Sequence, residues 1–160
     1  MINPNWPRWV FASVSKHFID IIEATDTKVY VEGDDRNTNE FKTFIEFRMD
    51  GPTEKRLTKI ESDLRIEISL LVTTMKDDKD AHILERYIGN ASLGFTTGIS
   101  VFRFGDSPDP ENPLFEGCLT LETESKRALI ISKFGLVQTD LPVLQATLNA
   151  FYSGRFVNKP

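Results

Sequence analysis

The sequence predicts an α+β fold with two helices and six or seven strands, and three observations lead to this prediction. Apolar residues recur at helical spacing in two separate stretches, residues 8–24 and residues 76–95. Apolar and polar residues alternate with a period of two over residues 41–49 and 64–72. The strands outnumber the helices, and a hairpin separates the two helices, which is not the pattern of a doubly wound parallel sheet. We therefore expect one domain over residues 1–160, with a mixed or mainly antiparallel sheet and two flanking helices.

The first helix is the clearest element. Phe11, Val14, Phe18 and Ile21/Ile22 are three or four residues apart and form one apolar face. Pro7 suits the first helical turn, where its missing N–H costs nothing, and residues 1–7 are expected to form an N-terminal arm. Trp6 and Trp9 lie at the start of this helix and have two interpretations. They either cap the core or anchor a partner subunit, since tryptophan is enriched at interface hot spots.

Residues 50–63 are predicted to form the outer part of a long hairpin. The alternating strands at 41–49 and 64–72 flank them, Asp50-Gly51-Pro52-Thr53 has turn chemistry, and residues 54–63 are charged and partly extended. We expect the tip or outer half of this hairpin to project from the sheet. The charges within it alternate in sign, which suits salt-bridged contacts between subunits better than phosphate binding. The candidate interface residues here are Lys55, Arg56, Lys59 and Glu61.

Phe44 is an exception to the alternation, because it lies on the polar face of its strand. We expect it to contact a second layer, which is either a helix or another subunit. Asp106 and Asp109 belong to the segment 106–113, which holds three prolines and three acidic residues and is therefore a loop. Both aspartates are also candidate interface residues.

The remaining elements follow from shorter patterns. The second helix is expected to begin at the acidic residues 76–80, with Ala81, Leu84, Ile88, Ala91 and Phe95 as its apolar stripe. Shorter strands are predicted at residues 28–32, 99–104, 117–123 and 128–134. The last segment is either a helix over residues 140–152 or a strand over residues 143–156. Its threonine, phenylalanine and tyrosine content favours the strand.

The residue types give no indication of catalysis, so we predict a protein that is not an enzyme and has no cofactor, metal or catalytic residue. His17 and His82, the two histidines, are not spaced as metal ligands. Residues 89–94 are glycine-spaced but lack the lysine of a phosphate loop. Cys118, the single cysteine, is expected to behave as a small hydrophobic residue within a strand.

Charge and hydropathy limit the partners. The formal net charge of −5 argues against a protein that grips a nucleic-acid backbone. No window holds 18 apolar residues, so no membrane partner is expected. The first residues lack the basic start and apolar core of a signal peptide. We expect synthesis in the cytoplasm.

Several short stretches carry a resemblance to a known class of protein: Pro4-Asn5-Trp6-Pro7-Arg8-Trp9-Val10, Glu32-Gly33, Phe47-Arg48-Met49-Asp50-Gly51-Pro52, Phe134-Gly135 and Leu144-Gln145-Ala146-Thr147-Leu148. Together they make residues 4–156 similar to the small structural proteins of tailed-phage virions, of the tail-terminator or head–tail connector kind.

This resemblance implies an α+β subunit of the virion that assembles into a ring, usually hexameric, beside neighbouring tail or connector proteins. DNA would pass through the lumen without specific binding. Six copies at −5 each would carry −30, and an acidic lumen repels DNA and lets it slide. No catalytic residue carries over, and the copy number of the ring, its position along the tail and the host stay open.

The alternative is a monomeric α+β module that binds a small apolar ligand between helix and sheet. Five phenylalanines would line its pocket: Phe41, Phe44, Phe47, Phe102 and Phe104. A ring protein should assemble with rising concentration, whereas a ligand-binding module should be monomeric or dimeric.

Overall fold

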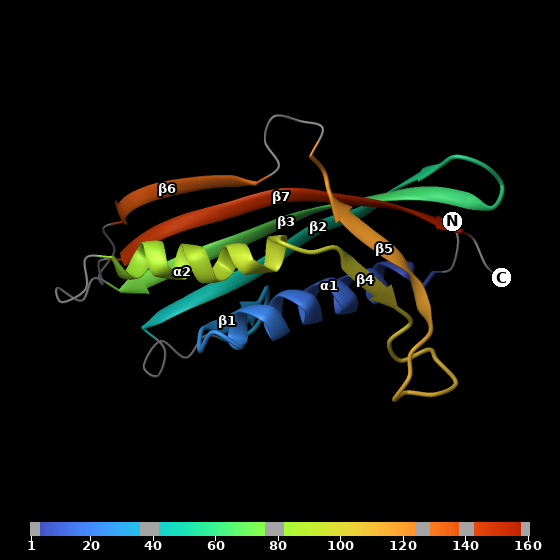
Figure 1. Ribbon diagram of the computed structural model, residues 1–160, viewed down its shortest axis with the longest axis horizontal. Helices are drawn as coiled ribbons and strands as arrows, with labels where there is room; N and C mark the ends of the chain where they lie inside the picture. Colours follow the sequence, from blue (N-terminus) through green and yellow to red (C-terminus); the bar gives the residue numbers. More distant parts are fainter. Residues whose placement is uncertain (1–3, 36–41, 76–81, 124–128, 138–142, 158–160) are drawn as a thin grey trace.

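The protein is α+β, with helices against one face of a long, curled sheet (Figure 1). The computed structural model describes residues 4–35, 42–75, 82–123, 129–137 and 143–157. The helical elements of this part of the chain are α1 (Trp6–Glu23), α2 (Ile83–Ser92) and the short 3₁₀ turn η1 (Leu93–Phe95). Its strands are β1 (Lys28–Val31), β2 (Thr43–Arg56), β3 (Glu61–Met75), β4 (Ile99–Phe102), β5 (Phe115–Leu121), β6 (Ile130–Val137) and β7 (Val143–Val157).

The sheet is mixed. Its order is β1-β2-β3-β7-β5-β4, and β6 also pairs with β7. β1 runs parallel to β2, and the other pairs are antiparallel. β3 and β7 pair from Glu61↔Val157 to Met75↔Val143, so two strands of 15 residues form the middle of the sheet. On its other side, β7 pairs first with β6 and then with β5.

The core lies between the helices and the inner face of the sheet. In α1 the buried stripe is Val10, Val14, Phe18 and Ile22, one residue earlier than predicted at its start, and Phe11 lies at the exposed margin. Opposite lie the alternating residues of the central strands, among them Ile45, Phe47, Ile66, Ile68, Leu70, Leu148 and Tyr152. Period-two alternation predicted this face correctly, because each strand buries every second side chain.

The turn after α2 fits closely against α1. A Cβ on Gly94 would lie 2.4 Å from the Phe18 ring, so only glycine allows this approach. The Gly94 carbonyl also accepts a hydrogen bond from His17 Nε2 at 2.9 Å. His17 therefore has a structural role, as its isolated position in the sequence indicated. The predicted acidic start of the second helix, residues 76–80, lies outside the described residues.

The structure decides two questions about the strands. Residues 143–157 form a strand, which confirms the interpretation favoured by their composition. Residues 50–53 were predicted as a turn, and this is wrong. They form a β-bulge inside β2, where Asp50 pairs with Glu67 and Thr53 pairs with Arg65. Gly51 has φ of +99°, so the glycine that suggested a turn instead supplies the bulge conformation.

Two further predictions need correction. Trp6 and Pro7 belong to α1 and not to an N-terminal arm. Cys118 is exposed and does not act as a buried hydrophobic residue, because the alternation in β5 turns Leu119 inward and Cys118 outward.

Candidate assembly interface

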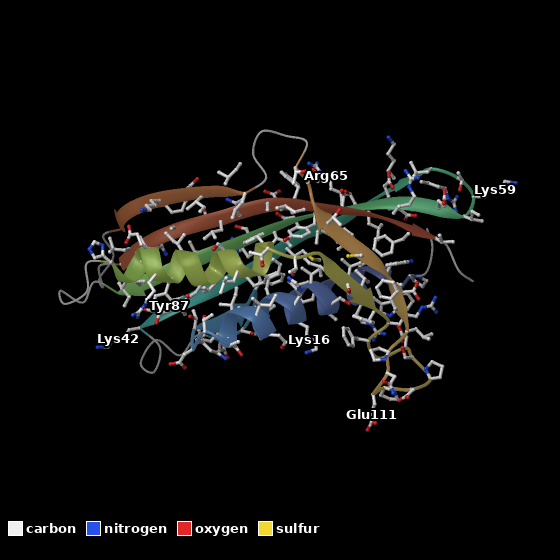
Figure 2. The ribbon with its side chains drawn as sticks, in the orientation of Figure 1. Lys16, Lys42, Lys59, Arg65, Tyr87 and Glu111 are labelled. Carbon is white, nitrogen blue, oxygen red and sulfur yellow. The ribbon has the colours of Figure 1, made fainter. Side chains whose placement is uncertain are left out.

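The first candidate surface is the tip of the β2–β3 hairpin, residues 55–60, which we call the basic tip. It holds three cations, Lys55, Arg56 and Lys59, and no carboxylate. Leu57 and Ile60 are exposed there, and Ile60 keeps 60% of its surface in solvent. Figure 2 shows Lys59 at this end of the molecule. The tip therefore presents positive charge and apolar side chains together.

Local hydrogen bonds fix the shape of the basic tip. The N–H groups of Leu57 and Thr58 donate to the Glu61 carbonyl at 3.0 and 3.2 Å. Thr58 Oγ1 accepts the N–H groups of Ile60 and Glu61 at 3.2 and 3.0 Å. These contacts satisfy the turn internally, as serine and threonine hydroxyls commonly do. The apolar side chains are therefore held out by a formed turn.

The hairpin has more support than its sequence indicated. Residues 61–66 pair with β7, and Arg155 Nε lies 3.4 Å from Asp63 Oδ1 across this pairing. Ser62 Oγ donates to Glu54 Oε1 at 2.7 Å, which ties β3 to β2. Within residues 50–63, the part beyond the paired strands is consequently the turn at 57–60.

The second candidate surface is the loop of residues 106–113, which we call the acidic loop. It carries Asp106, Asp109 and Glu111 and no cation. Leu114 and Phe115 follow it and are exposed, Phe115 by 55%. In Figure 2, Lys59 lies at the right-hand end of the molecule and Glu111 on its lower side.

The acidic loop is anchored at both ends. Asp106 accepts hydrogen bonds from Arg8 Nη2 at 2.6 Å and from the Trp9 indole N–H. The bond from Arg8, followed by that from Trp9, holds the pKa of Asp106 below its usual range. Arg103 pairs with Glu116 close to the other end, and the Glu116 side chain is only 4% exposed. The loop is thus fixed to α1 and to β5.

Asp109 shapes the middle of this loop. Its carboxylate accepts the Asn112 side-chain amide at 2.9 Å and the Glu111 N–H at 3.0 Å. The bond from Asn112 is the main reason that the pKa of Asp109 is lowered. Ser107 Oγ donates to the Arg103 carbonyl, and it accepts the Leu114 N–H at 2.8 Å. Both candidate aspartates therefore organise the loop, whereas the Glu111 carboxylate has no hydrogen bond or ion pair to any described residue.

The third candidate surface was not predicted. It is the outer edge of β6, where Ile130, Ile131 and Phe134 are exposed, Phe134 by 57%. Among the described residues, β7 is the only strand that pairs with β6. An apolar run is visible here in the sequence, but the run could not show that one edge of the strand is unpaired among the described residues.

The remaining predicted interface residues lie in the core. Trp6 and Trp9 are 4% and 1% exposed, and Trp6 packs edge-on against Phe156. Phe44 is buried and packs edge-on against Tyr30 of the parallel neighbour β1. Tyr30 lies on the adjacent strand of the same sheet, so this contact is neither the helix nor the second subunit that the sequence predicted. Of these three aromatic residues, none offers an exposed ring to a partner, and the core interpretation of the tryptophans is the one that their burial supports.

An open groove of about 800 Å³ lies between the hairpin and β5. Arg65 crosses it and donates to the two Glu122 carboxylate oxygens from Nε and Nη2, at 2.9 and 3.0 Å. This pairing raises the pKa of Arg65 above its ordinary value. The same guanidinium lies 3.9 Å from the centre of the Phe151 ring. Because Glu122 neutralises the Arg65 guanidinium, this pair has a structural role in the groove, and Arg65 is not available to bind an anion.

The phenylalanine-lined pocket of the alternative function is not assembled as expected. Phe44 and Phe47 are buried in packed layers, and Phe41 lies outside the described residues. Phe102 and Phe104 do line a groove of about 300 Å³ between α1 and β4. They share it with polar side chains, including Lys16, His17 and Asp20.

A search of the described residues for metal sites and membrane spans finds neither. No group of three or more histidine, cysteine, aspartate or glutamate side chains is placed to hold a metal ion. In the same part of the chain, no helix is long and apolar enough to cross a membrane.

No protein-family model matches the chain, and a search of curated proteins finds no significant match.

Proposed function

We propose that this chain is a structural protein of a tailed-phage virion whose copies form a ring at the tail or the head–tail junction. The observation that carries this proposal is the edge of β6, which pairs with β7 alone among the described strands and has three exposed apolar side chains. The unpaired N–H and C=O groups of an edge strand can form backbone hydrogen bonds with a strand of another chain. The phage setting is supported by the sequence resemblance over residues 4–156.

The edges of this sheet differ in how they are protected. The outer half of β2 also extends past its neighbour, since β1 pairs only as far as Phe47. That half carries the bulge at residues 50–53, a proline and several charges, which are devices that discourage edge pairing. β6 has a bulge between Lys133 and Gly135, yet residues 130–133 form a regular run beside it. The contrast favours β6 as the edge that receives a partner.

The direction of assembly follows from strand order. β1 and β6 lie at opposite edges of the sheet. If β6 of one copy pairs with the β1 edge of the next copy, the contact joins two different surfaces of the subunit. The same head-to-tail contact can then repeat from copy to copy. Heterologous contacts of this kind close into rings when the rotation allows. In such a ring the hairpin turn at 57–60 extends toward a neighbouring subunit.

The proposal is tested by placing a charge on the β6 edge. Ile131→Lys should abolish or strongly weaken self-association in sedimentation velocity, because a lysine on an edge strand opposes pairing. Leu93→Lys is the matched control, since Leu93 is equally exposed but lies in η1, away from any strand edge. Loss of assembly in both variants, or in neither, would contradict a specific role for β6.

A further inference from the structure

The basic tip and the acidic loop are complementary in charge and in apolar content. Each presents three ionised groups of one sign, cations over residues 55–60 and carboxylates over residues 106–113. Each also has two large exposed apolar side chains beside those charges, Leu57 and Ile60 on the tip, Leu114 and Phe115 next to the loop.

We propose that the basic tip of one copy docks onto the acidic loop of the next copy. This inference rests on the proposed ring, and it names a contact that the β6 edge does not include. In Figure 2, Lys59 of the tip lies at the right-hand end of the molecule, and Glu111 of the loop lies on its lower side. Because the two surfaces point in different directions, the acidic loop that a tip reaches is that of another copy, and the contact is head to tail.

Preorganisation favours this contact. The hydroxyl of Thr58 fixes the tip, while Arg8 and Trp9 hold the loop through Asp106. Surfaces that are already ordered lose less conformational entropy when they bind. Opposite charges at the contact would raise the association rate and fix the register of neighbouring copies.

The charges in the loop have separate tasks. The Asp106 and Asp109 carboxylates are engaged by groups of their own chain, whereas the Glu111 carboxylate has no partner among the described residues. Glu111 is therefore the loop carboxylate that we assign to a cation of the neighbouring tip. Leu114 and Phe115 would cover Leu57 and Ile60 of that tip, and the burial of apolar surface would add to the charge attraction.

A charge-swap experiment tests the pairing. In the tip variant, Lys55, Arg56 and Lys59 are each replaced by glutamate. In the loop variant, Glu111 and Asn112 are each replaced by lysine. The Asn112→Lys side chain can still donate a hydrogen bond to the Asp109 carboxylate. Both sets of positions lie on the surface, and near-ultraviolet circular dichroism checks that each variant keeps its fold.

Each variant alone should run at the monomer mass of 18.2 kDa at concentrations where the wild type assembles. A 1:1 mixture of the two should recover most of the wild-type mass, because the acidic tip then meets the basic loop and the unchanged tip meets the unchanged loop. Wild-type assembly by either variant alone, or a mixture that stays monomeric, would overturn the pairing.

The outcome also separates this inference from the proposed function. If both charge-swap variants assemble normally while Ile131→Lys does not, the ring stands and the tip–loop contact fails. If a tip or loop variant loses its fold, single changes, Lys55→Glu and Glu111→Lys, repeat the test by the same mixing. A wild-type chain that stays monomeric at all concentrations would overturn both proposals.

Discussion

The indole N–H of Trp9 donates a hydrogen bond to the carboxylate of Asp106. This contact joins the first turns of α1 to the base of the acidic loop, 97 residues further along the chain. Arg8 binds the same carboxylate, and Arg103 lies 4.9 Å from the centre of the Trp9 ring. Trp9, which the sequence offered as a candidate anchor for a partner subunit, thus positions a loop of its own subunit.

Asp106→Asn should lower the melting temperature at neutral pH, since it removes the charge that Arg8 and Trp9 bind. The pKa of Asp106 is lowered in the folded state, so its stabilising effect is present above the ordinary carboxyl range. It is lost as the pH falls below about 3.8 toward the folded-state pKa. The gap in melting temperature between wild type and variant should therefore close in acid.

Glu111→Gln is the control for this measurement, because it removes a carboxylate of the same loop that has no partner among the described residues. At a protein concentration where the chain is monomeric, its melting temperature should match that of the wild type across the same pH range. An Asp106→Asn variant with unchanged melting temperature at pH 7 would show that the Arg8 and Trp9 contacts do not stabilise the fold.

Gly94→Ala should destabilise the protein by about 1–3 kcal/mol, because the new Cβ would overlap the Phe18 ring. Gly89→Ala is the matched control, since Gly89 lies in α2 and a Cβ there meets nothing within 4 Å. That change should raise the free energy of unfolding by about 0.5–1 kcal/mol, because alanine favours the helix. Urea unfolding of the pair distinguishes the effects, and equal shifts would contradict the close packing of η1 on α1.

Tyr152→Phe should leave stability unchanged or raise it by about 1 kcal/mol at pH 7. The Tyr152 hydroxyl is buried and has no hydrogen-bond partner among the described residues, and an unpaired buried hydroxyl costs free energy. Chemical denaturation of wild type and variant measures the difference. A loss of more than about 1 kcal/mol in the variant would reveal a partner for the hydroxyl.

The same pair of proteins should diverge at high pH. Burial raises the pKa of Tyr152 to about 12 in the folded state, from 10.0 in the absence of burial. Between pH 10 and 12 the unfolded chain loses this proton while the folded chain keeps it, so wild-type stability falls by up to about 2 kcal/mol. The variant lacks this loss. Parallel stability curves over that range would contradict the burial of the hydroxyl.

The sequence correctly predicted which side chains are buried where the pattern within one element decides the burial. The inner face of β3 is an example, because alternation alone identifies Ile66, Ile68 and Leu70 as buried. The positions of Phe44 and Phe134 depend on other segments. Phe44 is buried beside Tyr30 of the parallel strand β1, whereas Phe134 is exposed in β6, which pairs with β7 alone among the described strands. Strand order decides both, and no local pattern encodes it.

The candidate site was predictable in part for the same reason. The charges of the basic tip and the acidic loop are visible as runs in the sequence. The Asp106 carboxylate accepts a hydrogen bond from Trp9, and the Asp109 carboxylate accepts one from Asn112. The sequence could not predict these two hydrogen bonds, because they depend on how the chain folds. The proline and glycine of residues 50–53 suit a turn and a bulge equally, so their chemistry could not distinguish the two.

The most direct test of the account is the mass of the wild-type chain, measured by light scattering on a sizing column over a concentration series at two salt concentrations. Ring assembly predicts a mass that rises with concentration to about six times 18.2 kDa and falls with added salt, since salt screens contacts between exposed charges. A mass of 18.2 kDa at every concentration and at both salt levels would contradict assembly through these surfaces.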